Sequence, residues 1–171
     1  MNNPSNLNLA MQLDIPGYAL GISMLTVVML FHGTALIQIA KRYEVKSFLY
    51  LAEHKYSEVT VAFYISILCL FFTHILEIIL WGVCLWMLDL MPNLGLSIYF
   101  SGSNYTAMGF SNDALQSGWQ ILSVIIAFSG MFAFAWTASV MISMTKNFRQ
   151  AYTRLHMKRL NIAEDIIKRF E

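Results

Sequence analysis

The basic side chains of this chain are confined to two short blocks, and long apolar runs fill the sequence outside them. All 11 Lys and Arg lie within 41–55 and 146–169, so 1–40 and 56–145 contain none. About 20 consecutive apolar residues are enough for a helix to cross the hydrocarbon core of a membrane. The chain has three runs of that length, at 15–40, 59–88 and 114–145. The sequence therefore predicts three transmembrane helices.

Composition agrees with a membrane protein and excludes several soluble classes. Hydrophobic residues make up 57% of the chain and charged residues only 12%, about half the charged share of a soluble domain. Such a chain is neither a disordered protein nor a nucleic-acid binder. Its two cysteines, Cys69 and Cys84, lie on one predicted helix, at a separation of roughly 22 Å that a disulfide does not span. We therefore expect an all-α membrane protein.

The basic blocks also set the expected topology. Lys and Arg gather on the cytoplasmic side of membrane proteins, so both blocks should be cytoplasmic, with the N-terminus outside. Residues 1–14 lack the basic start of a signal peptide, and we expect the first run to be retained. The predicted segments are a short extracellular N-terminus at 1–14, an additional transmembrane helix at 15–40, a cytoplasmic loop at 41–58, a two-span region at 59–145 and a cytoplasmic amphipathic helix at 146–171.

The region 59–145 contains a segment of different character between its two long runs. Residues 90–113 are uncharged up to Asp113 but rich in Gly, Asn and Ser, which makes them too polar to cross lipid as one helix. Irregular backbone at membrane depth is tolerated where protein buries it or where it lines a water-filled cavity. The pattern predicts a re-entrant hairpin, with a short helix over 94–105 and an extended return over 106–112.

Two strings in this segment are similar to a known family. Ser97–Ser101 reads S-I-Y-F-S, and Thr106–Asn112 reads T-A-M-G-F-S-N. They resemble the pore helix and selectivity filter of the P-loop tetrameric cation channels, in particular the small bacterial potassium-channel type, whose pattern is A-L-Y-F-S and then T-T-V-G-Y-G-D. Residues 74–81 resemble the outer helix of a bacterial subgroup, and the run that begins at Gly118 resembles the inner helix. The resemblance covers about 71–144 and leaves 1–58 uncovered.

This resemblance implies a channel subunit, not an enzyme, that forms a homotetramer around a central pore in the bacterial inner membrane. It makes 59–145 the pore domain, with an outer helix, a pore helix, a filter and an inner helix. It implies passive conduction of monovalent cations, potassium above all, without a cofactor. By position, the filter comprises Thr106, Ala107, Met108, Gly109, Phe110 and Ser111, the pore mouth Asn112 and Asp113, and the gating hinge Gly130.

The filter departs from the family pattern at several positions. Against T-V-G-Y-G, only Gly109 is identical. Ala107 lacks the hydroxyl that helps to replace the hydration shell of the ion. Ser111 replaces a glycine where the left-handed conformation costs another residue ~1–2 kcal/mol. We therefore expect weakened selectivity, with measurable passage of sodium.

Gly130 and the residues that follow it are open to two interpretations. Gly130 is either the hinge or a small residue that lets helices pack closely. Thr137, Met141 and Thr145 recur every four residues below it, so they share a helix face. We expect this face to line an inner vestibule.

Three ionisable residues lie inside the predicted spans. His74 and Glu77 are one helical turn apart, and His32 lies at a similar depth on the first run. One interpretation is that they form structural hydrogen bonds with one another or with the pore helix. The other is a proton sensor, because imidazole changes charge near neutral pH. We predict no metal, because the spans hold no further carboxylate.

The tail carries apolar residues at helical spacing, namely Phe148, Tyr152, Leu155, Ile162, Ile166 and Phe170. This pattern predicts either a four-helix bundle below the pore or a helix lying on the inner leaflet, with room for a cytoplasmic partner. Two other functions stay open for the whole chain: a non-conducting accessory or assembly protein with a degenerate pore loop, and a small transporter that uses His32, His74 and Glu77.

Overall fold

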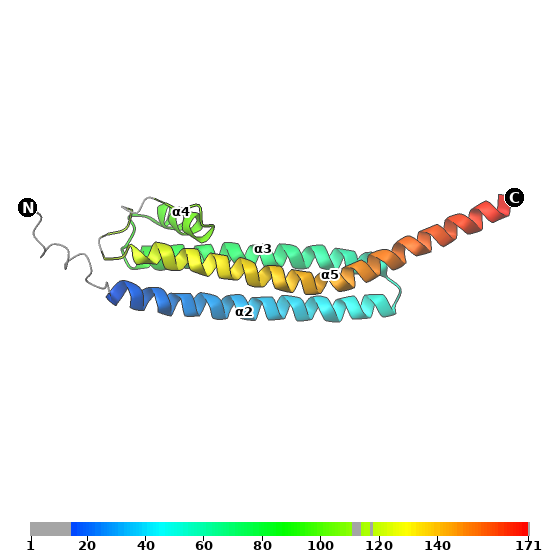
Figure 1. The fold of residues 1–171 in the computed structure, drawn as a ribbon, viewed down its shortest axis with the longest axis horizontal. Coiled ribbons are helices and arrows are strands. Elements are labelled where there is room, and N and C mark those ends of the chain that lie inside the picture. The colour runs from blue at the N-terminus through cyan, green and yellow to red at the C-terminus, as the bar shows by residue number, and fades with distance from the viewer. Residues whose placement is uncertain (1–14, 111–113, 117, 171) are drawn as a thin grey trace, which may run out of the picture. The chain divides into compact units, whose positions relative to one another are not determined.

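The computed structural model describes residues 15–110, 114–116 and 118–170, with side chains as far as Met157. Its helices are α2 (Ile15–Ala52), α3 (Tyr56–Met87), α4 (Leu94–Tyr105) and α5 (Ile121–Phe170) (Figure 1). In the described part of the chain, all the regular elements are helices, which confirms the predicted all-α class.

Three of these helices fit membrane spans. The segments Ile15–Ala52, Tyr56–Met87 and Ile121–Met157 are long and apolar enough to cross a bilayer. Helix α4 has 12 residues, which at 1.5 Å per residue gives about 18 Å, too short to cross. It has the bounds predicted for the short helix between the second and third spans.

The long helices run past the apolar runs that predicted them. Helix α2 continues through Lys41 to Ala52, and α3 begins at Tyr56, so the predicted loop at 41–58 is helical except for a short turn. The charged residues end the apolar run but are good helix formers, and neither Gly nor Pro interrupts them. The turn comes at His54, whose φ is 57°.

Helix α5 likewise continues from the third span to Phe170, so the predicted C-terminal helix at 146–171 is not a separate element. Of its apolar pattern, Phe148 stacks on Phe63 with ring centroids 4.5 Å apart, and Tyr152 lies beside Phe148. Ile162, Ile166 and Phe170 lie outside the described side chains.

The chain packs as two units, which we describe separately. Unit 1 comprises residues up to Leu30 together with Leu76–Phe132, and unit 2 comprises Phe31–Ile75 together with Ala133–Glu171. Each of α2, α3 and α5 contributes residues to both units, whereas α4 lies in unit 1.

Unit 2 has an apolar core made by α2, α3 and α5, which consists of Leu36, Tyr43, Ala62, Phe63, Leu70 and Met144. The Tyr43 ring is buried in this core, and its hydroxyl donates to the Met144 carbonyl at 3.2 Å. This hydrogen bond satisfies the one polar atom that the ring brings into the core.

Unit 1 is built on close approaches at glycines. On α2, Gly17 and Gly21 form a G-x-x-x-G pattern, which lets transmembrane helices approach closely. A Cβ at Gly17 would lie 2.8 Å from the Gly118 carbonyl oxygen, and one at Gly21 would meet Ile125 of α5.

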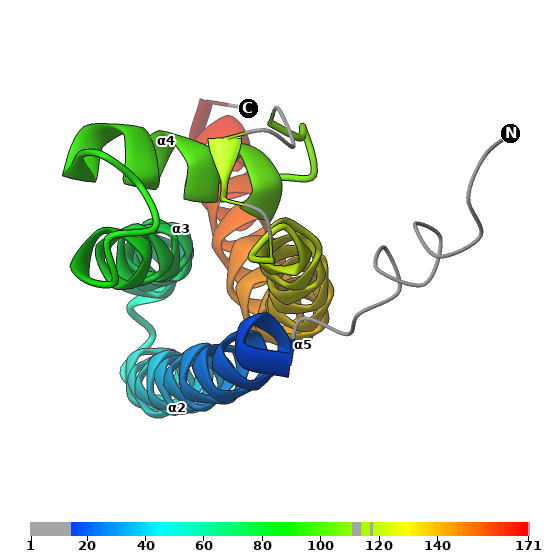
Figure 2. The ribbon, with the colours of Figure 1, turned by 90° about the vertical axis from the view of Figure 1, so that its left-hand side faces the viewer.

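Helix α4 packs against α3 and α5 in the same way (Figure 2). A Cβ at Gly82 of α3 would lie 2.7 Å from a side-chain carbon of Ile98. A Cβ at Gly130 of α5 would overlap the carbonyl oxygen of Tyr105, the last residue of α4. Close packing therefore explains why residue 130 is glycine, without any role as a hinge.

Replacing Gly130 by Ala tests this contact. The added methyl meets backbone rather than a movable side chain, so we expect a loss of about 1–3 kcal/mol, typical of overpacking. The measurement is the thermal unfolding midpoint in detergent. Gly102→Ala on α4 is the matched control, because its new Cβ would lie no closer than 3.4 Å to Ile78. Equal midpoints for the two variants would contradict the packing role of Gly130.

Candidate functional site

The start of α4 is set by a helix cap. Asn93 has an extended backbone, and its side chain accepts a hydrogen bond from the Leu96 amide at 2.8 Å. The Ser97 hydroxyl donates to the Asn93 carbonyl at 2.9 Å. Asn is among the preferred N-cap residues because its short side chain reaches these otherwise unpaired amides. The cap fixes where the short helix begins after Pro92.

The end of α4 is anchored by a buried hydrogen bond to α3. Tyr105 and Glu77 are both fully buried, and the Tyr105 hydroxyl donates to Oε2 of Glu77 at 2.5 Å. One turn further along α3, Trp81 Nε1 donates to the Ser129 hydroxyl of α5 at 3.1 Å. The sequence allowed a structural hydrogen bond between Glu77 and the short helix, and the structure contains that bond.

The residues after Tyr105 close the helix instead of leaving it as an extended strand. The Ala107 amide donates to the Asn104 carbonyl at 2.8 Å, and the Met108 amide donates to the Ser103 carbonyl at 2.9 Å. This pair of hydrogen bonds is a Schellman motif, a common way to satisfy the last carbonyls of a helix. The predicted extended return at 106–112 is therefore wrong for its first residues.

The Schellman motif places unusual backbone conformations in the predicted filter. Ala107 has φ 58° and Gly109 has φ 83°. The first of these positions usually holds glycine, and a β-branched residue there would be a conformational outlier. The family pattern has Thr at this position, so Ala107 fits the observed turn better than Thr would. The sequence pointed to strain at Ser111, which lies outside the described residues together with Asn112 and Asp113.

The described part of the loop is open to its surroundings. The Met108 side chain is 83% exposed, and a Cβ at Gly109 would have no heavy atom within 4 Å. Phe110 instead turns back onto α4, with its ring centroid 5.5 Å from those of both Tyr99 and Phe100. The loop is thus fixed at its start and exposed at its centre.

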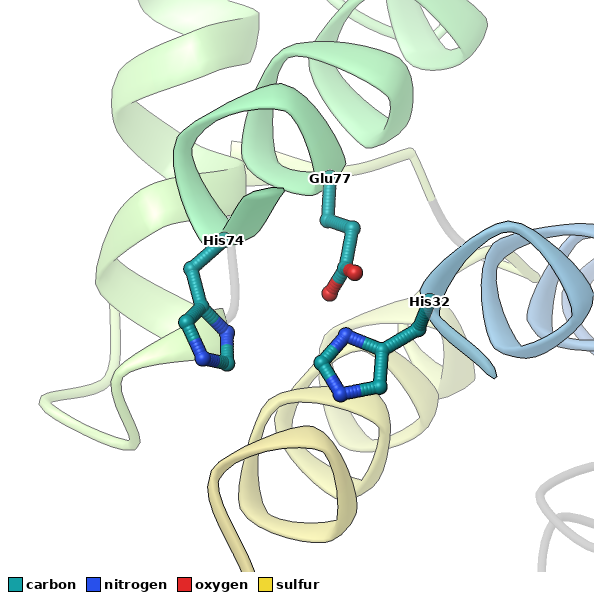
Figure 3. Close-up of side chains that lie close together, drawn as sticks. All are labelled: His32, His74 and Glu77. Atoms are coloured by element: carbon teal, nitrogen blue, oxygen red, sulfur yellow. The ribbon is translucent and has the colours of Figure 1, made fainter. Parts of the chain in front are cut away.

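The two histidines of the spans meet in unit 2. His32 of α2 and His74 of α3 are buried, with ring centroids 5.3 Å apart, and Figure 3 shows the imidazoles between their helices, with Glu77 on the next turn of α3. The Thr137 hydroxyl of α5 lies 3.3 Å from His32 Nε2 and 3.1 Å from His74 Nε2. We call these three residues the histidine–threonine cluster.

Aromatic rings border this cluster. The Phe134 ring stacks on His74 with centroids 4.5 Å apart, and the Trp136 ring lies 5.8 Å from His32. His32, His74 and Glu77 each offer one possible metal-ligand atom, and these atoms lie within 4.8 Å of one another. Three ligands are fewer than the four of a structural zinc site, and the absence of a metal stays a prediction.

Two of the three predicted vestibule residues, Thr137 and Met141, pack within the chain. Thr137 is only 7% exposed and is bonded within the cluster. Met141 packs against the core of unit 2, and the Thr145 hydroxyl donates to the Met141 carbonyl at 2.8 Å. Their four-residue spacing does identify one helix face. Thr137 and Met141 on that face pack within the chain, and the vestibule lining stays a prediction.

Sequence reasoning missed Tyr105 as an anchor and Thr137 as the partner of the histidines. The sequence did contain a signal, namely hydroxyl groups inside predicted helices that would need acceptors once buried. A Tyr at the end of a short helix and a Thr inside a span both need a partner when buried, and Glu77 and the two imidazoles offer acceptors.

A family model described as an ion channel matches residues 73–147. The matched segment contains Glu77, the whole of α4, the loop after it and the first half of α5, but none of α2. Comparison with curated proteins and with solved structures finds no match. The family match supports an ion-channel function for the segment that holds α4.

The positive φ of Ala107 predicts that replacing this residue by glycine raises the stability of the protein. Glycine adopts positive φ without the penalty that Ala pays, so we expect Ala107→Gly to stabilise the protein by roughly 1 kcal/mol. Ala138→Gly, in the exposed middle of α5, should instead destabilise it by about 1 kcal/mol. Thermal midpoints in detergent measure both variants. A lower midpoint for Ala107→Gly would contradict the observed turn.

The Tyr105 anchor makes a second prediction. Tyr105→Phe keeps the ring but leaves the buried Glu77 carboxyl without this donor, so we expect a loss of about 1–3 kcal/mol. Tyr99→Phe, at a ring 64% exposed on the same helix, should have no measurable effect. Chemical denaturation monitored by circular dichroism compares the two variants. Equal stabilities would show that the hydrogen bond does not hold α4.

Proposed function

We propose that this chain is one subunit of a homotetrameric channel that conducts monovalent cations passively across a bacterial inner membrane. In this proposal α3 is the outer helix, α4 the re-entrant pore helix and α5 the inner helix. Residues 106–111 form the filter, and Asn112 and Asp113 form its mouth. The N-terminus lies outside and the C-terminus in the cytoplasm, because both basic blocks then face the cytoplasm.

The observation that carries the proposal is the way in which α4 is held. A helix too short to cross a membrane is anchored through buried Tyr105 to α3, and it packs on α5 at Gly130. The exposed loop follows directly, with Met108 at its centre. Irregular backbone at membrane depth needs protein or a water-filled cavity around it. Three further copies around a central axis would supply both.

The electrostatics of α4 favour a cation at this loop. The C-terminal end of a helix carries a partial negative charge of about half an elementary charge. The last turn of α4 contains no basic residue that would neutralise it. Ions at the loop would therefore meet a negative potential, which attracts cations and repels anions.

The exposed face of α5 is the better candidate for contact with the pore or a neighbouring subunit. Ala135, Ala138 and Ser139 are small and exposed, and Ile142 is 73% exposed. Small residues allow close approach of helices or leave room for water. This face replaces the buried Thr137 face in the proposed architecture.

We expect the selectivity for potassium to be weak. Ala107 contributes no hydroxyl to an ion, and its carbonyl belongs to a turn rather than to an extended row. Fewer contiguous carbonyl sites discriminate less between ions that differ in hydration. Sodium should therefore pass measurably beside potassium.

Ion flux from purified protein in liposomes tests the proposal. We expect the liposomes to take up both potassium and sodium. We expect the purified particles to have four times the chain mass of 19.5 kDa. Gly109→Ala should keep that mass but lower the flux about tenfold, since positive φ costs Ala ~1–2 kcal/mol and 1.4 kcal/mol is a factor of ten.

Gly95→Ala is the control, because its new Cβ would lie no closer than 3.5 Å to Asn93, and it should conduct like the unmodified protein. Absence of flux from intact tetramers would favour a non-conducting accessory protein. Flux from a monomer, or flux that Gly109→Ala leaves unchanged, would contradict the assignment of the filter. Strong rejection of sodium would contradict the proposed selectivity.

A further inference from the structure

We propose that the parts of α2 and α5 just past their apolar runs bind anionic phospholipids through a band of basic side chains. The basic band consists of five exposed residues in unit 2, namely Lys41, Arg42, Lys46, Lys146 and Arg149. Three of the five belong to α2, which lies outside the family match. Lipid binding at this band does not require that the chain conduct ions.

A buried hydrogen bond places the two halves of the basic band at the same level. The Tyr43 hydroxyl of α2 donates to the Met144 carbonyl of α5 at 3.2 Å. The apolar run ends at residue 40 on α2 and at residue 145 on α5, so both runs end beside this bond. Each basic residue of the band lies within five positions of the bond along its own helix, or about 8 Å at 1.5 Å per residue. The band therefore follows the level at which both helices leave the hydrocarbon core.

The charge at this level is almost entirely positive. One acidic residue, Glu44, stands among the basic residues of α2, and α5 has none over 146–157. Helix α3 adds no charge there, because 59–73 contains no Lys, Arg, His, Asp or Glu. Among the described side chains, a salt bridge joins Lys55 to Glu53 at 2.7 Å and none involves the band. Five basic groups beside one carboxylate create a positive potential, which attracts anions.

Exposed apolar side chains at the same level favour a lipid over a soluble anion. On α2, Val45 and Phe48 are 61% and 74% exposed. The Phe63 ring of α3 lies 5.9 Å from the Tyr43 ring, so α3 reaches this level, and the next residue, Tyr64, is 58% exposed. A free phosphate ion has no contact to offer these side chains. A phospholipid offers its phosphate to the basic residues and its acyl chains to the apolar ones.

The spacing of the basic residues suits phosphate groups at a membrane surface. Arg42 and Lys46 are four positions apart on α2, so they share a helix face. Lys146 and Arg149 share a face of α5 for the same reason. Such side chains lay their methylene stems along apolar surface while the charged ends reach water. A guanidinium donates two parallel hydrogen bonds to one phosphate, and an ammonium adds a point charge. Each pair can therefore hold one anionic headgroup.

Electron spin resonance of the full chain in phosphatidylcholine vesicles, doped with a spin-labelled lipid, measures the affinity for each headgroup. We expect phosphatidylglycerol to associate more strongly than phosphatidylcholine with the same acyl chains. The expected preference is about fivefold or more, because one basic residue near an anionic surface contributes about fivefold. Arg42→Gln combined with Lys146→Gln removes one residue from each pair, and the ratio of the two association constants should fall about fivefold.

Lys55→Gln is the matched control for the double variant. Lys55 is exposed, lies outside the basic band and is paired with Glu53, so its loss should leave the wild-type ratio unchanged. Raising the salt from 0.1 to 1 M shortens the Debye length from about 10 to 3 Å and should lower the wild-type ratio. Equal association of the two lipids with wild type, or an equal loss of preference in Lys55→Gln, would overturn the proposal.

Soluble glycerol phosphate distinguishes a lipid from a free phosphate group. Added to wild type at matched ionic strength, it should leave the preference for phosphatidylglycerol unchanged, because it has no acyl chain. Displacement of the labelled phosphatidylglycerol would show a site for free phosphate and would overturn the lipid assignment. The thermal midpoint in detergent shows whether the double variant is folded. If it is not, the salt and glycerol phosphate experiments on wild type decide the outcome. A chain that binds phosphatidylglycerol without conducting ions would remove the channel function and keep the lipid site.

Discussion

The position of Tyr105 is the constraint on which the candidate pore region depends. Its hydroxyl is held by Glu77 of α3, and its backbone lies directly against Gly130 of α5. A 12-residue helix has too few hydrogen bonds of its own to be stable in isolation. Helix α4 therefore owes its place to these contacts, to the Asn93 cap and to the close approach of Ile98 to Gly82.

Buried polar groups are costly in an apolar helix unless they find partners. In this chain they divide into two sets. In unit 1, Glu77 serves the pore helix, and Trp81 serves Ser129. In unit 2, His74 shares the Thr137 hydroxyl with His32. Glu77 and His74, one turn apart on α3, thus each make a hydrogen bond to a different helix, Glu77 to α4 and His74 to α5.

The sequence was sufficient for the helices and for the bounds of α4, because apolar runs, Pro92 and a cluster of Gly and Asn mark them directly. It was insufficient for the ends of α2 and α5, since Lys, Arg and Glu end an apolar run without ending a helix. It also failed to orient Thr137. A helix that is apolar all round has no polar face to show which side is packed, and only the tertiary partners His32 and His74 decide it. The positive φ of Ala107 was equally hidden, because Ala is not a residue that marks such a turn.

The most direct test of the channel claim is a planar-bilayer recording that places a probe on the exposed loop. Met108→Cys, in a background with Cys69 and Cys84 replaced by Ala, carries its single thiol on the residue that is 83% exposed at the centre of the candidate filter. If four copies of this loop surround the ion path, a charged thiol reagent added from outside will block the current, and the same reagent will leave the background protein unaffected. A current that persists unchanged after complete labelling of Cys at this position would contradict the account, because ions would then be crossing elsewhere.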